Sequence, residues 1–458
     1  MGRVNDCPFC LEKQREIDRL KEENGLLKQR LSYRERKDKE GFFGSSTPSS
    51  QQPVKANTED VKKPRGAKIG HKGFGRKGFS VSEADRVERV EALVVQRCPF
   101  CGGSLEDKGE EARSVLDIHP VKAERVLYLQ KKKWCRRCGK SFRGEVPGVL
   151  PRNLYSNQLM ATATTMHYLH GIPLGRVCEQ LGVGDGSLVE IFHRMARLFS
   201  GVIPKLIEEY RQAPVKHADE TGWRTDGKNG YAWLFATLKI SLFQFKKTRS
   251  SSVPRAIFGE ERLPGTLVVD RYSGYNKMPC DIQYCYSHLL REVEDLEKEF
   301  ADQGEIQAFV STVAPLLTLA MGLRRQPISD VQFSLKASEV KGQIKLTMQT
   351  PAQHMGIRRI QDIFTEHEGR LYHWADNREV PADNNLAERD LRPTVIARKV
   401  SFGSQSDAGA HTRSVLMTVA HTLRKRGEDV AVRLKFVLDE LAKDMSKDPF
   451  PLLFSKPP

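Results

Sequence analysis

The feature that most constrains this chain is a short apolar run that ends abruptly in a carboxylate. Residues 266–269 read Thr-Leu-Val-Val, and Asp270 follows them directly. A continuous apolar, β-branched run of this length is typical of a strand buried on both faces. A carboxylate at the end of such a strand is costly to bury unless something pairs with it, and a metal ion is the usual partner. The sequence therefore predicts an α/β core with an acidic site at the end of one strand.

A second carboxylate, Asp219, follows a weaker strand pattern at residues 213–218. A β-hairpin is expected after it, because a turn pattern at residues 225–228 leads into two apolar strands within residues 231–245. Glu220 stands beside Asp219 and is a rival ligand. Taken alone, Asp219 has the character of an unrelated surface carboxylate, so its assignment depends on the other acidic residues.

The third carboxylate, Glu388, is expected on a helix whose cap lies at residues 383–385. The residues expected to be buried first in this helix are Leu386, Ala387 and Leu391. Two aspartates on strands and one glutamate on a helix predict a site for two divalent cations. Such a pair of cations stabilises both the attacking and the leaving oxygen of an in-line phosphoryl displacement.

At these three stretches the chain resembles the insertion-sequence-66 family of bacterial transposases. The resemblance covers most of the chain and is sharpest at residues 384–393, continued by Arg398 and Lys399. It implies a ribonuclease-H-like core with an Asp-Asp-Glu triad formed by Asp219, Asp270 and Glu388. The second and third triad residues lie 118 positions apart, which is too long for a bare core of this type. The resemblance therefore also implies an inserted subdomain.

Cys285 and His288 follow the second aspartate, where many such transposases carry a Cys-x-x-His signature. Both are potential zinc ligands, but two ligands make no site. The resemblance implies a role near the active centre, with His288 in contact with the scissile phosphate; a satisfied, partly buried histidine is the alternative. The other residues expected to support the active site are Asn384, Arg389 and Arg392.

The composition points to a nucleic-acid partner. Lys and Arg number 74 against 58 Asp and Glu, a net charge of +16 that suggests a polyanionic ligand. No run of about 18 apolar residues and no signal peptide is recognisable, so no membrane association is expected. Six of the nine cysteines lie in Cys-x-x-Cys pairs, which fits zinc in a reducing compartment better than disulfides. We expect a cytoplasmic, nucleoid-associated protein.

Residues 1–40 predict a coiled coil. A heptad pattern places one polar residue among apolar seam positions, which favours a parallel pair over a lone helix packed on its own chain. The seam residues are Ile17, Leu20, Asn24, Leu27 and Leu31. A further hypothesis is that Cys7 and Cys10 of two such chains share one zinc ion.

Residues 41–85 predict a flexible linker that leads into a basic, glycine-rich arm. Glycines between basic residues allow the backbone to lie close to phosphates or in a minor groove, whereas a solvated charged tail is the alternative. The basic residues expected to contact DNA are Lys62, Lys63, Arg65, Lys68, Lys72, Arg76 and Lys77.

Residues 86–148 predict a zinc ribbon. Two Cys-x-x-Cys-Gly knuckles flank expected hairpin strands at residues 113–118 and 125–129. Four thiolates fit a closed structural zinc site, and the ligands are Cys98, Cys101, Cys135 and Cys138. Whether the ribbon touches DNA or only holds its domain together stays open.

Residues 149–210 predict a helix-turn-helix. A helix at residues 174–181 is followed by a glycine-rich break and a second helix at residues 187–196. Ser187 is expected to cap the second helix, which would enter the major groove with His193 and Arg194. A helical hairpin that serves only as core is the alternative.

The remainder of the chain is expected to complete the core. Residues 291–382 predict a helical insertion with breaks at Pro315, Pro327 and Pro351. Residues 383–445 return to the core, where Arg398 and Lys399 are expected to hold DNA phosphates, with an ordinary solvated face as the alternative. Residues 446–458 are expected to form a loosely held tail.

The sequence thus predicts a multidomain α+β protein: coiled coil, zinc ribbon and helix-turn-helix, then an α/β ribonuclease-H-like core at residues 211–290 and 383–445 with a helical insertion. The resemblance implies a DNA transposase that cleaves element ends to 3′ hydroxyls and joins them to target DNA. Its expected cofactors are Mg²⁺ or Mn²⁺ and Zn²⁺, and its expected partners are DNA, further copies of the chain and accessory transposition proteins. A non-catalytic DNA-binding regulator and a metal-dependent nuclease without joining remain the alternatives.

Overall fold

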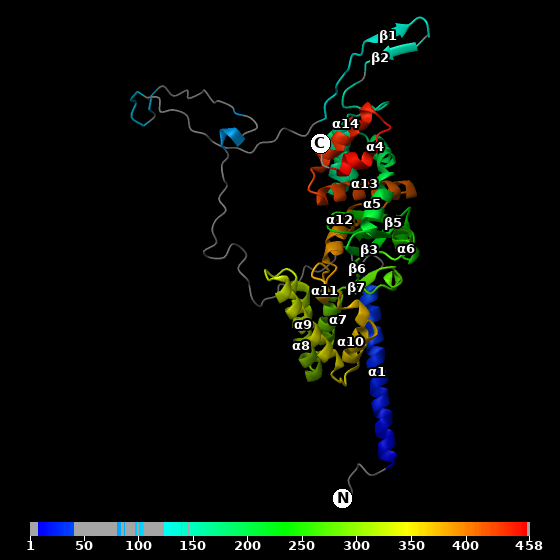
Figure 1. Cartoon of the computed structure of the whole chain (residues 1–458), viewed down its shortest axis with the longest axis vertical. Helices are drawn as coiled ribbons and strands as arrows, with labels where there is room; N and C mark the ends of the chain where they lie inside the picture. The colour runs from blue at the N-terminus through cyan, green and yellow to red at the C-terminus, as the bar shows by residue number, and fades with distance from the viewer. Residues whose placement is uncertain are drawn as a thin grey trace. The chain divides into compact units, whose positions relative to one another are not determined.

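The structure is a computed structural model of the chain (Figure 1). It describes residues 8–40, 80–83, 87, 97–98, 100–104, 123–138, 140–144 and 146–455. These residues fall into two units, one comprising Met1–Pro48 with Ala123–Pro458 and the other Ser49–Lys122. The basic arm expected at residues 62–77, the hairpin strand expected at residues 113–118, and Cys7 all lie outside the described residues.

A mixed five-stranded sheet in the order β5-β4-β3-β6-β7 forms the centre of the first unit. Its antiparallel part is β3 (Val215–Thr225), β4 (Lys228–Ala236) and β5 (Ser241–Lys246), and its parallel part adds β6 (Thr266–Val269) and β7 (Asp281–Tyr284) beside β3. The predicted hairpin is confirmed, with Asp226 and Gly227 at positive φ in its turn. The predicted buried strand before Asp270 is also confirmed, because every residue of β6 is buried.

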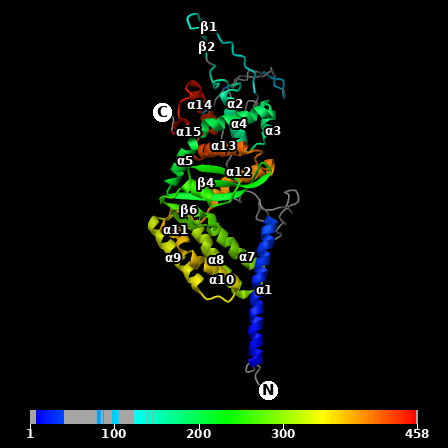
Figure 2. The same ribbon diagram turned by 90° about the vertical axis from the view of Figure 1, so that its right-hand side faces the viewer.

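Helices cover the sheet on both faces and along one edge. α12 (Asn385–Ser401) packs on β3 and β4, and α13 (Asp407–Lys425) lies between α12 and the helices α2 (Asn157–Thr164) and α4 (Asp185–Phe199) (Figure 2). α13 also covers the edge of β5, where the Thr418 hydroxyl accepts the Phe243 N–H at 2.9 Å. This hydrogen bond gives a partner to a backbone N–H on the outer edge of β5, which would otherwise be left unpaired. On the opposite face, β4 packs against α5 (Val202–Arg211) and α6 (Ser252–Phe258) through the rings of Tyr210, Phe235 and Phe258.

A helical layer precedes the sheet in the chain. It consists of α2 (Asn157–Thr164), a π-helical turn η3 (Thr165–Leu169), α3 (Leu174–Leu181) and α4 (Asp185–Phe199). The helix pair and the break at Gly182, which is in the left-handed conformation, are confirmed. The expected cap at Ser187 is wrong, because α4 already begins at Asp185 with Gly184 as its N-cap. Glycine is also a favoured N-cap residue.

The C-terminal helices pack on this layer. α14 (Val430–Lys443) lies against α2, and α15 (Pro449–Phe454) follows it. The expectation of a loose tail is wrong for most of residues 446–458. Asp448 caps α15 through the Phe450 N–H, and Leu453 is fully buried, so one apolar side chain and one cap fix this segment.

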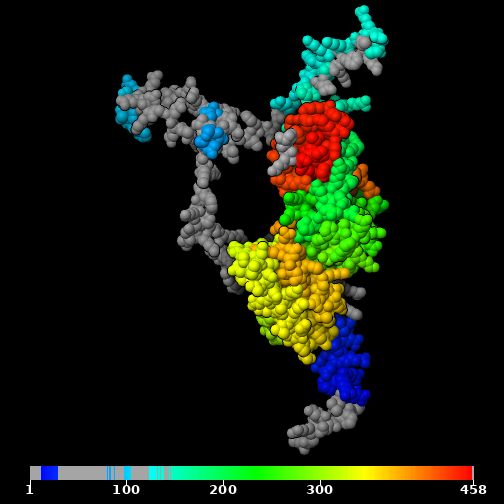
Figure 3. All heavy atoms as spheres, viewed as in Figure 1, coloured from blue at the N-terminus to red at the C-terminus, as the bar shows by residue number. Residues whose placement is uncertain are grey.

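The segment between β7 and α12 is helical, as predicted. It contains α7 (Tyr286–Glu299), α8 (Gly304–Leu323), α9 (Asp330–Gln349), α10 (Met355–Glu366) and α11 (His373–Asp376), and Figure 3 shows it in colours from yellow-green to orange beside the green sheet region. The expected break at Pro315 is wrong, because α8 continues through it. Val313 and Leu317 are fully buried on either side, and this burial offsets the hydrogen bond that proline removes.

By length and composition, α8 is the one helix of the described chain that is long and apolar enough to cross a membrane. It packs between α7 and α9 and buries Ile306, Phe309, Val310 and Val313 among other apolar residues. This is the arrangement of a core helix.

The helix α1 (Pro8–Glu40) carries the predicted seam. Ile17, Leu20 and Leu27 are 44%, 50% and 54% exposed, so the seam is largely uncovered within a single chain. Intrahelical contacts between charged side chains, such as the ion pair of Lys13 with Glu16, stabilise the polar side of the helix. The parallel pairing of two such helices stays a prediction.

Candidate active site

The register of the sheet decides which acidic side chains share a face. Asp219 lies within β3 rather than after it, and there it pairs with Leu234 of β4, whereas Glu220 pairs with Trp233. Residues directly opposite one another in an antiparallel pair point to the same face, and successive residues alternate. Asp219 and Glu220 therefore point to opposite faces of the sheet.

Asp270 points to the same face of the sheet as Asp219. Within β6, Val268 pairs with His217 of β3, and both residues are two positions before an aspartate. Because the period of a strand is two residues, the two aspartates follow on the same side. Asp270 ends the strand by accepting the backbone N–H of Tyr272 at 3.0 Å.

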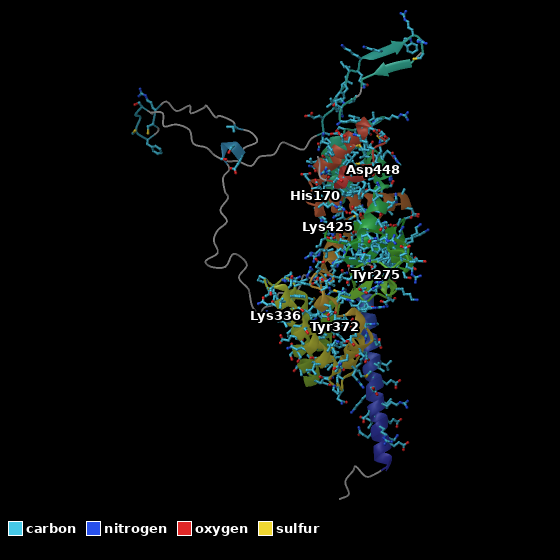
Figure 4. All side chains as sticks on the ribbon, viewed as in Figure 1. His170, Tyr275, Lys336, Tyr372, Lys425 and Asp448 are labelled. Atoms are coloured by element: carbon cyan, nitrogen blue, oxygen red, sulfur yellow. The ribbon has the colours of Figure 1, made fainter. Side chains whose placement is uncertain are left out.

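Glu220 has a complete set of partners on its own face. Its carboxylate accepts Nε and Nη2 of Arg249 at 2.8 and 2.6 Å and the hydroxyl of Tyr275 at 2.5 Å. Tyr275, labelled in Figure 4, ends the turn η4 (Ser273–Tyr275) that follows Asp270. Burial and the neighbouring Asp270 raise the pKa of Glu220, while Tyr275 and Arg249 oppose this shift. Glu220 is therefore a paired carboxylate, and the sheet separates it from the α12 side.

Asn384 fixes the start of α12 beside the strand that carries Asp219. Its side chain donates to the Ala218 carbonyl at 2.8 Å and accepts from His217 Nδ1 at 2.8 Å. Burial lowers the pKa of His217 to about 4, so the ring is neutral and Nδ1 carries its proton. The backbone N–H of Asn384 donates to Cys285 Sγ at 3.1 Å. Asn384 is the N-cap residue, as predicted, but its side chain binds β3 instead of the helix.

Two further residues, Asp390 and Arg398, hold the rest of α12. Asp390 forms an ion pair with Lys425 of α13 and accepts the Ser241 hydroxyl at 2.9 Å. Arg398 donates to Thr221 Oγ1 at 2.9 Å and to the carbonyl of the following glycine at 2.7 Å. The helix that carries Glu388 is thus tied to the sheet near both of its ends and in between.

Glu388 lies one turn into α12 and faces α7. Its carboxylate forms an ion pair with Arg291 at 3.3 Å. Burial, and then the negative charges of Glu220, Asp270 and Glu388, raise the pKa of Asp219 well above its usual value. Asp219 is therefore close enough to the other two predicted triad carboxylates for their charges to act on it. Within the described part of the chain they are not, as a set of three, within 4.8 Å of one another.

This electrostatic strain fits a divalent cation. Carboxylate oxygens are the ligands that Mg²⁺ and Mn²⁺ take, and a bound cation would offset the repulsion that burial intensifies. The residues that would hold it are Asp219, Asp270 and Glu388. Their roles stay predictions, because a donor set of the right chemistry does not by itself show binding.

The remaining predicted residues of α12 differ in their surroundings. Arg389, Arg392 and Lys399 are exposed, whereas Arg398 is engaged with β3 as described. Cys285 is fully buried at the N-cap of α7, and His288 is half-buried one turn further on. Both lie beside Glu388, because one ligand atom each of Cys285, His288 and Glu388 falls within 4.8 Å of the other two.

The expected recognition helix is partly engaged within the fold. His193 Nδ1 lies 2.6 Å from the Thr412 hydroxyl of α13, and Arg194 donates to the Pro151 carbonyl at 2.6 Å. Ser187 is half-buried. Contacts of these residues with DNA stay predictions.

The first cysteine knuckle has the expected local geometry. The Cys98 N–H donates to the Gly103 carbonyl at 2.9 Å, and the Gly102 N–H donates back to the Cys98 carbonyl at 2.8 Å. Gly102 has φ of +73°, the left-handed conformation that glycine adopts freely. Hydrogen bonds from the backbone of Phe100 and Cys101 lower the pKa of Cys98, as suits a thiolate ligand.

The second knuckle is framed by a two-stranded hairpin, β1 (Lys132–Cys135) and β2 (Lys140–Arg143). Cys135 ends β1, and Cys138 lies exposed in the turn. The strand expected at residues 125–129 is wrong, because this segment forms no strand and the hairpin begins three residues later. The four-cysteine zinc assignment stays a prediction at the level of individual ligands.

Several residues that lie on the strand of Asp219 and Glu220, or that contact Glu220 or Glu388, were not singled out from the sequence. They are His217, Arg249, Tyr275 and Arg291. His217 could have been found from its position two residues before Asp219, and Arg291 from its position three residues after His288 on a helix. Nothing local marks Arg249 or Tyr275, which reach Glu220 from other parts of the chain.

Comparison with known proteins places this arrangement in a family. Residues 152–412 match the model of the Transposase IS66 family, and residues 96–139 match the zinc-finger binding domain of transposase IS66. Uncharacterized protein y4qI of Sinorhizobium fredii is 24% identical over 418 residues, covering 80% of this chain and 74% of its own length. Uncharacterized protein y4jD of the same organism is 22% identical over 437 residues, covering 85% and 83%. Because the first match spans more than half of the sequence and contains all three acidic residues, this chain belongs to the IS66 family of transposases and carries that family's zinc-finger domain.

Proposed function

We propose that this chain is an active DNA transposase that cuts element ends and joins the resulting 3′ hydroxyls to target DNA. The observation that carries the proposal is the attachment of Asn384 to Ala218 and His217, which brings the Glu388 helix to the strand face of Asp219. Half-buried carboxylates from remote parts of the sequence repel one another and have no structural reason to lie near each other. A divalent-cation site gives them one.

The topology supports a ribonuclease-H-like catalytic core. Three antiparallel strands are followed by two parallel ones on the other side of β3, and the first two acidic residues lie on adjacent strands. The helices α7 to α11 are inserted between β7 and α12, and α12 then returns to pack on β3 and β4. This arrangement supports the split core that the long interval between Asp270 and Glu388 predicts.

Asp219, Asp270 and Glu388 would hold Mg²⁺ or Mn²⁺. When bound, such ions stabilise charge on the attacking and leaving oxygens of phosphoryl transfer. The residues of the chain position the DNA. Arg291 lies beside Glu388. Arg249, held by Glu220 on the opposite face of the sheet and lying 4.2 Å above the Tyr272 ring, is partly exposed and lies close enough to Asp270 for their charges to interact. Both are suited to contact phosphates next to the reacting one.

In this proposal, the other parts of the chain bind the element ends and join two copies of the protein. The zinc-finger domain, the basic arm at residues 62–77 and the helix pair α3–α4 would bind the element ends. The exposed seam of α1, with Ile17, Leu20 and Leu27, would join two copies as a parallel coiled coil. A dimer would bring two element ends to one target site.

A single reaction tests the proposal against its two alternatives. Purified protein is incubated with magnesium, a labelled element end and supercoiled plasmid. We expect joined product, because an end that has been cut to a 3′ hydroxyl can attack a target phosphodiester without an external energy source. Cutting without joining would instead favour the nuclease, and binding without any reaction would favour the regulator. Omission of magnesium is the matched control and should abolish both steps.

A further inference from the structure

A second set of ligating atoms lies at the edge of the acidic site. One ligand atom each of Cys285, His288 and Glu388 lies within 4.8 Å of the other two. Cys285 is the N-cap of α7 and His288 follows three residues later, so one helical turn presents both side chains to the first turns of α12. The sequence shows only the first two ligands as a pair, and the fold supplies the third.

The imidazole of His288 is an independent sign that the cluster holds a ligand. Its Nδ1 atom is buried and, among the residues that the structure describes, has no hydrogen-bond partner. Buried polar atoms are nearly always paired, so a buried nitrogen without a partner calls for an explanation. A metal ion bound at this nitrogen would supply the missing interaction.

Backbone N–H groups surround the sulfur of Cys285. The side chain is fully buried, and Sγ accepts the backbone N–H of Asn384 at 3.1 Å. The backbone N–H groups of Ser287 and His288, at the N-terminus of α7, also face the sulfur, although burial raises the pKa of the free thiol to about 11. A metal ion must therefore displace the thiol proton, and the three N–H groups would then stabilise the negative charge on the metal-bound sulfur.

We propose that Cys285, His288 and Glu388 bind a transition-metal ion such as Zn²⁺, and that this ion inhibits the transposase by withdrawing Glu388 from magnesium. Thiolate and imidazole ligands select zinc over magnesium. Ligands of a tetrahedral zinc lie about 2.0 to 2.3 Å from the ion and hence roughly 3.3 to 3.8 Å from one another, so small side-chain rotations close the cluster. Binding releases the Cys285 thiol proton to solvent, and water completes the fourth position.

The binding step is tested without DNA or activity. Full-length protein with zinc retained in its finger is titrated with Co²⁺, whose thiolate complexes absorb by sulfur-to-metal charge transfer. We expect wild-type protein to bind one cobalt with this absorption and Cys285→Ser to lose it. Cys280→Ser, which changes another buried cysteine outside the cluster, should keep it. The same absorption in wild type and Cys285→Ser would overturn the proposal.

A second variant covers the case in which Cys285→Ser does not reach the wild-type fold by circular dichroism. His288→Ala removes a half-buried side chain and leaves the thiol in place. It is expected to bind cobalt at least about tenfold more weakly, because one of three protein ligands is lost. Unchanged cobalt affinity in this variant would equally count against the site.

The inhibitory step rests on the proposed function and is measured separately. At fixed magnesium, micromolar free zinc is expected to slow joining by wild-type protein and Cys280→Ser by about tenfold or more. Each protein is compared with its own zinc-free rate. Equal zinc sensitivity in His288→Ala would refute the inhibition while leaving the transposase activity established. A wild-type protein that binds cobalt but never joins DNA would refute the proposed function and not the metal site.

Discussion

Replacing Glu388 by glutamine is expected to reduce joining of element ends by about 10³-fold or more while leaving end binding unchanged. The substitution keeps the size of the side chain and removes the charge that would hold a divalent cation, and such a loss removes several kcal/mol of transition-state stabilisation. The fold should survive, because Glu388 is half-buried and its one ion pair, with Arg291, is partly exposed. Joining and end binding are measured on the same labelled DNA, the second by electrophoretic mobility.

The matched control is Glu297→Gln, the same chemical change at an exposed position of α7. It should join DNA at the wild-type rate. Retained joining by Glu388→Gln would remove this residue from the catalytic site. A loss of end binding in that variant would show that its defect lies in the fold or in DNA contact, and not in chemistry.

Replacing Asp219 by asparagine is expected to abolish joining and, at the same time, to stabilise the magnesium-free protein. The pKa of Asp219 is raised well above its usual value by burial and by the surrounding carboxylates. A raised pKa in the folded state means that stability from this group is complete below the unfolded pKa, about 3.9, and is lost as pH rises through the folded value. Near pH 8 the carboxyl of Asp219 therefore lowers the free energy of unfolding relative to a side chain that does not titrate, and asparagine avoids this cost.

Thermal or denaturant unfolding between pH 5 and pH 8 measures the effect. Asp219→Asn should exceed wild type in free energy of unfolding by about 1 kcal/mol or more at pH 8 and by less at pH 5. Added magnesium should stabilise wild type and not the variant. Magnesium-free buffer is used instead of a chelator, which would strip the zinc finger.

Asp302→Asn, the same change on an exposed loop, is the control and should behave like wild type. An Asp219→Asn protein that is less stable than wild type at pH 8, or that gains equally from magnesium, would show that Asp219 is not a strained metal-binding carboxylate.

The parts of the fold that the sequence predicts correctly are those with strong local patterns. β6 is a continuous apolar run, and the β3–β4 hairpin is marked by Asp226 and Gly227 at its turn. The break at Gly182 between two amphipathic helices is equally local. In each case the hydrophobic period or the turn chemistry already specifies the structure, and tertiary packing agrees with it.

The errors occur where tertiary packing outweighs a local signal. Pro315 is a helix breaker in isolation, yet α8 is held through it by burial between α7 and α9. The segment after Asp448 is rich in proline, yet Leu453 fits the core and a short helix forms. The strand β3 extends beyond Asp219 because β4 pairs with it along its whole second half.

The sequence predicts which three residues form the candidate site, but it does not predict how they are arranged in space. The bond of Asn384 to His217 joins positions 167 apart, and no local pattern reports it. The choice between Asp219 and Glu220 needed the register of β3 against β4, which places the two side chains on opposite faces. The third ligand beside Cys285 and His288 likewise follows only from the packing of α12 on the sheet.

The central claim is that Asp219, Asp270 and Glu388 hold a divalent cation at one point. Anomalous scattering from crystals of the protein grown or soaked with Mn²⁺ tests it most directly. We expect a manganese peak within about 2.2 Å of oxygens of both aspartates, with Glu388 completing the protein ligands. Manganese bound instead on the Glu220 face, or absent from the two aspartates at saturating concentration, would contradict it.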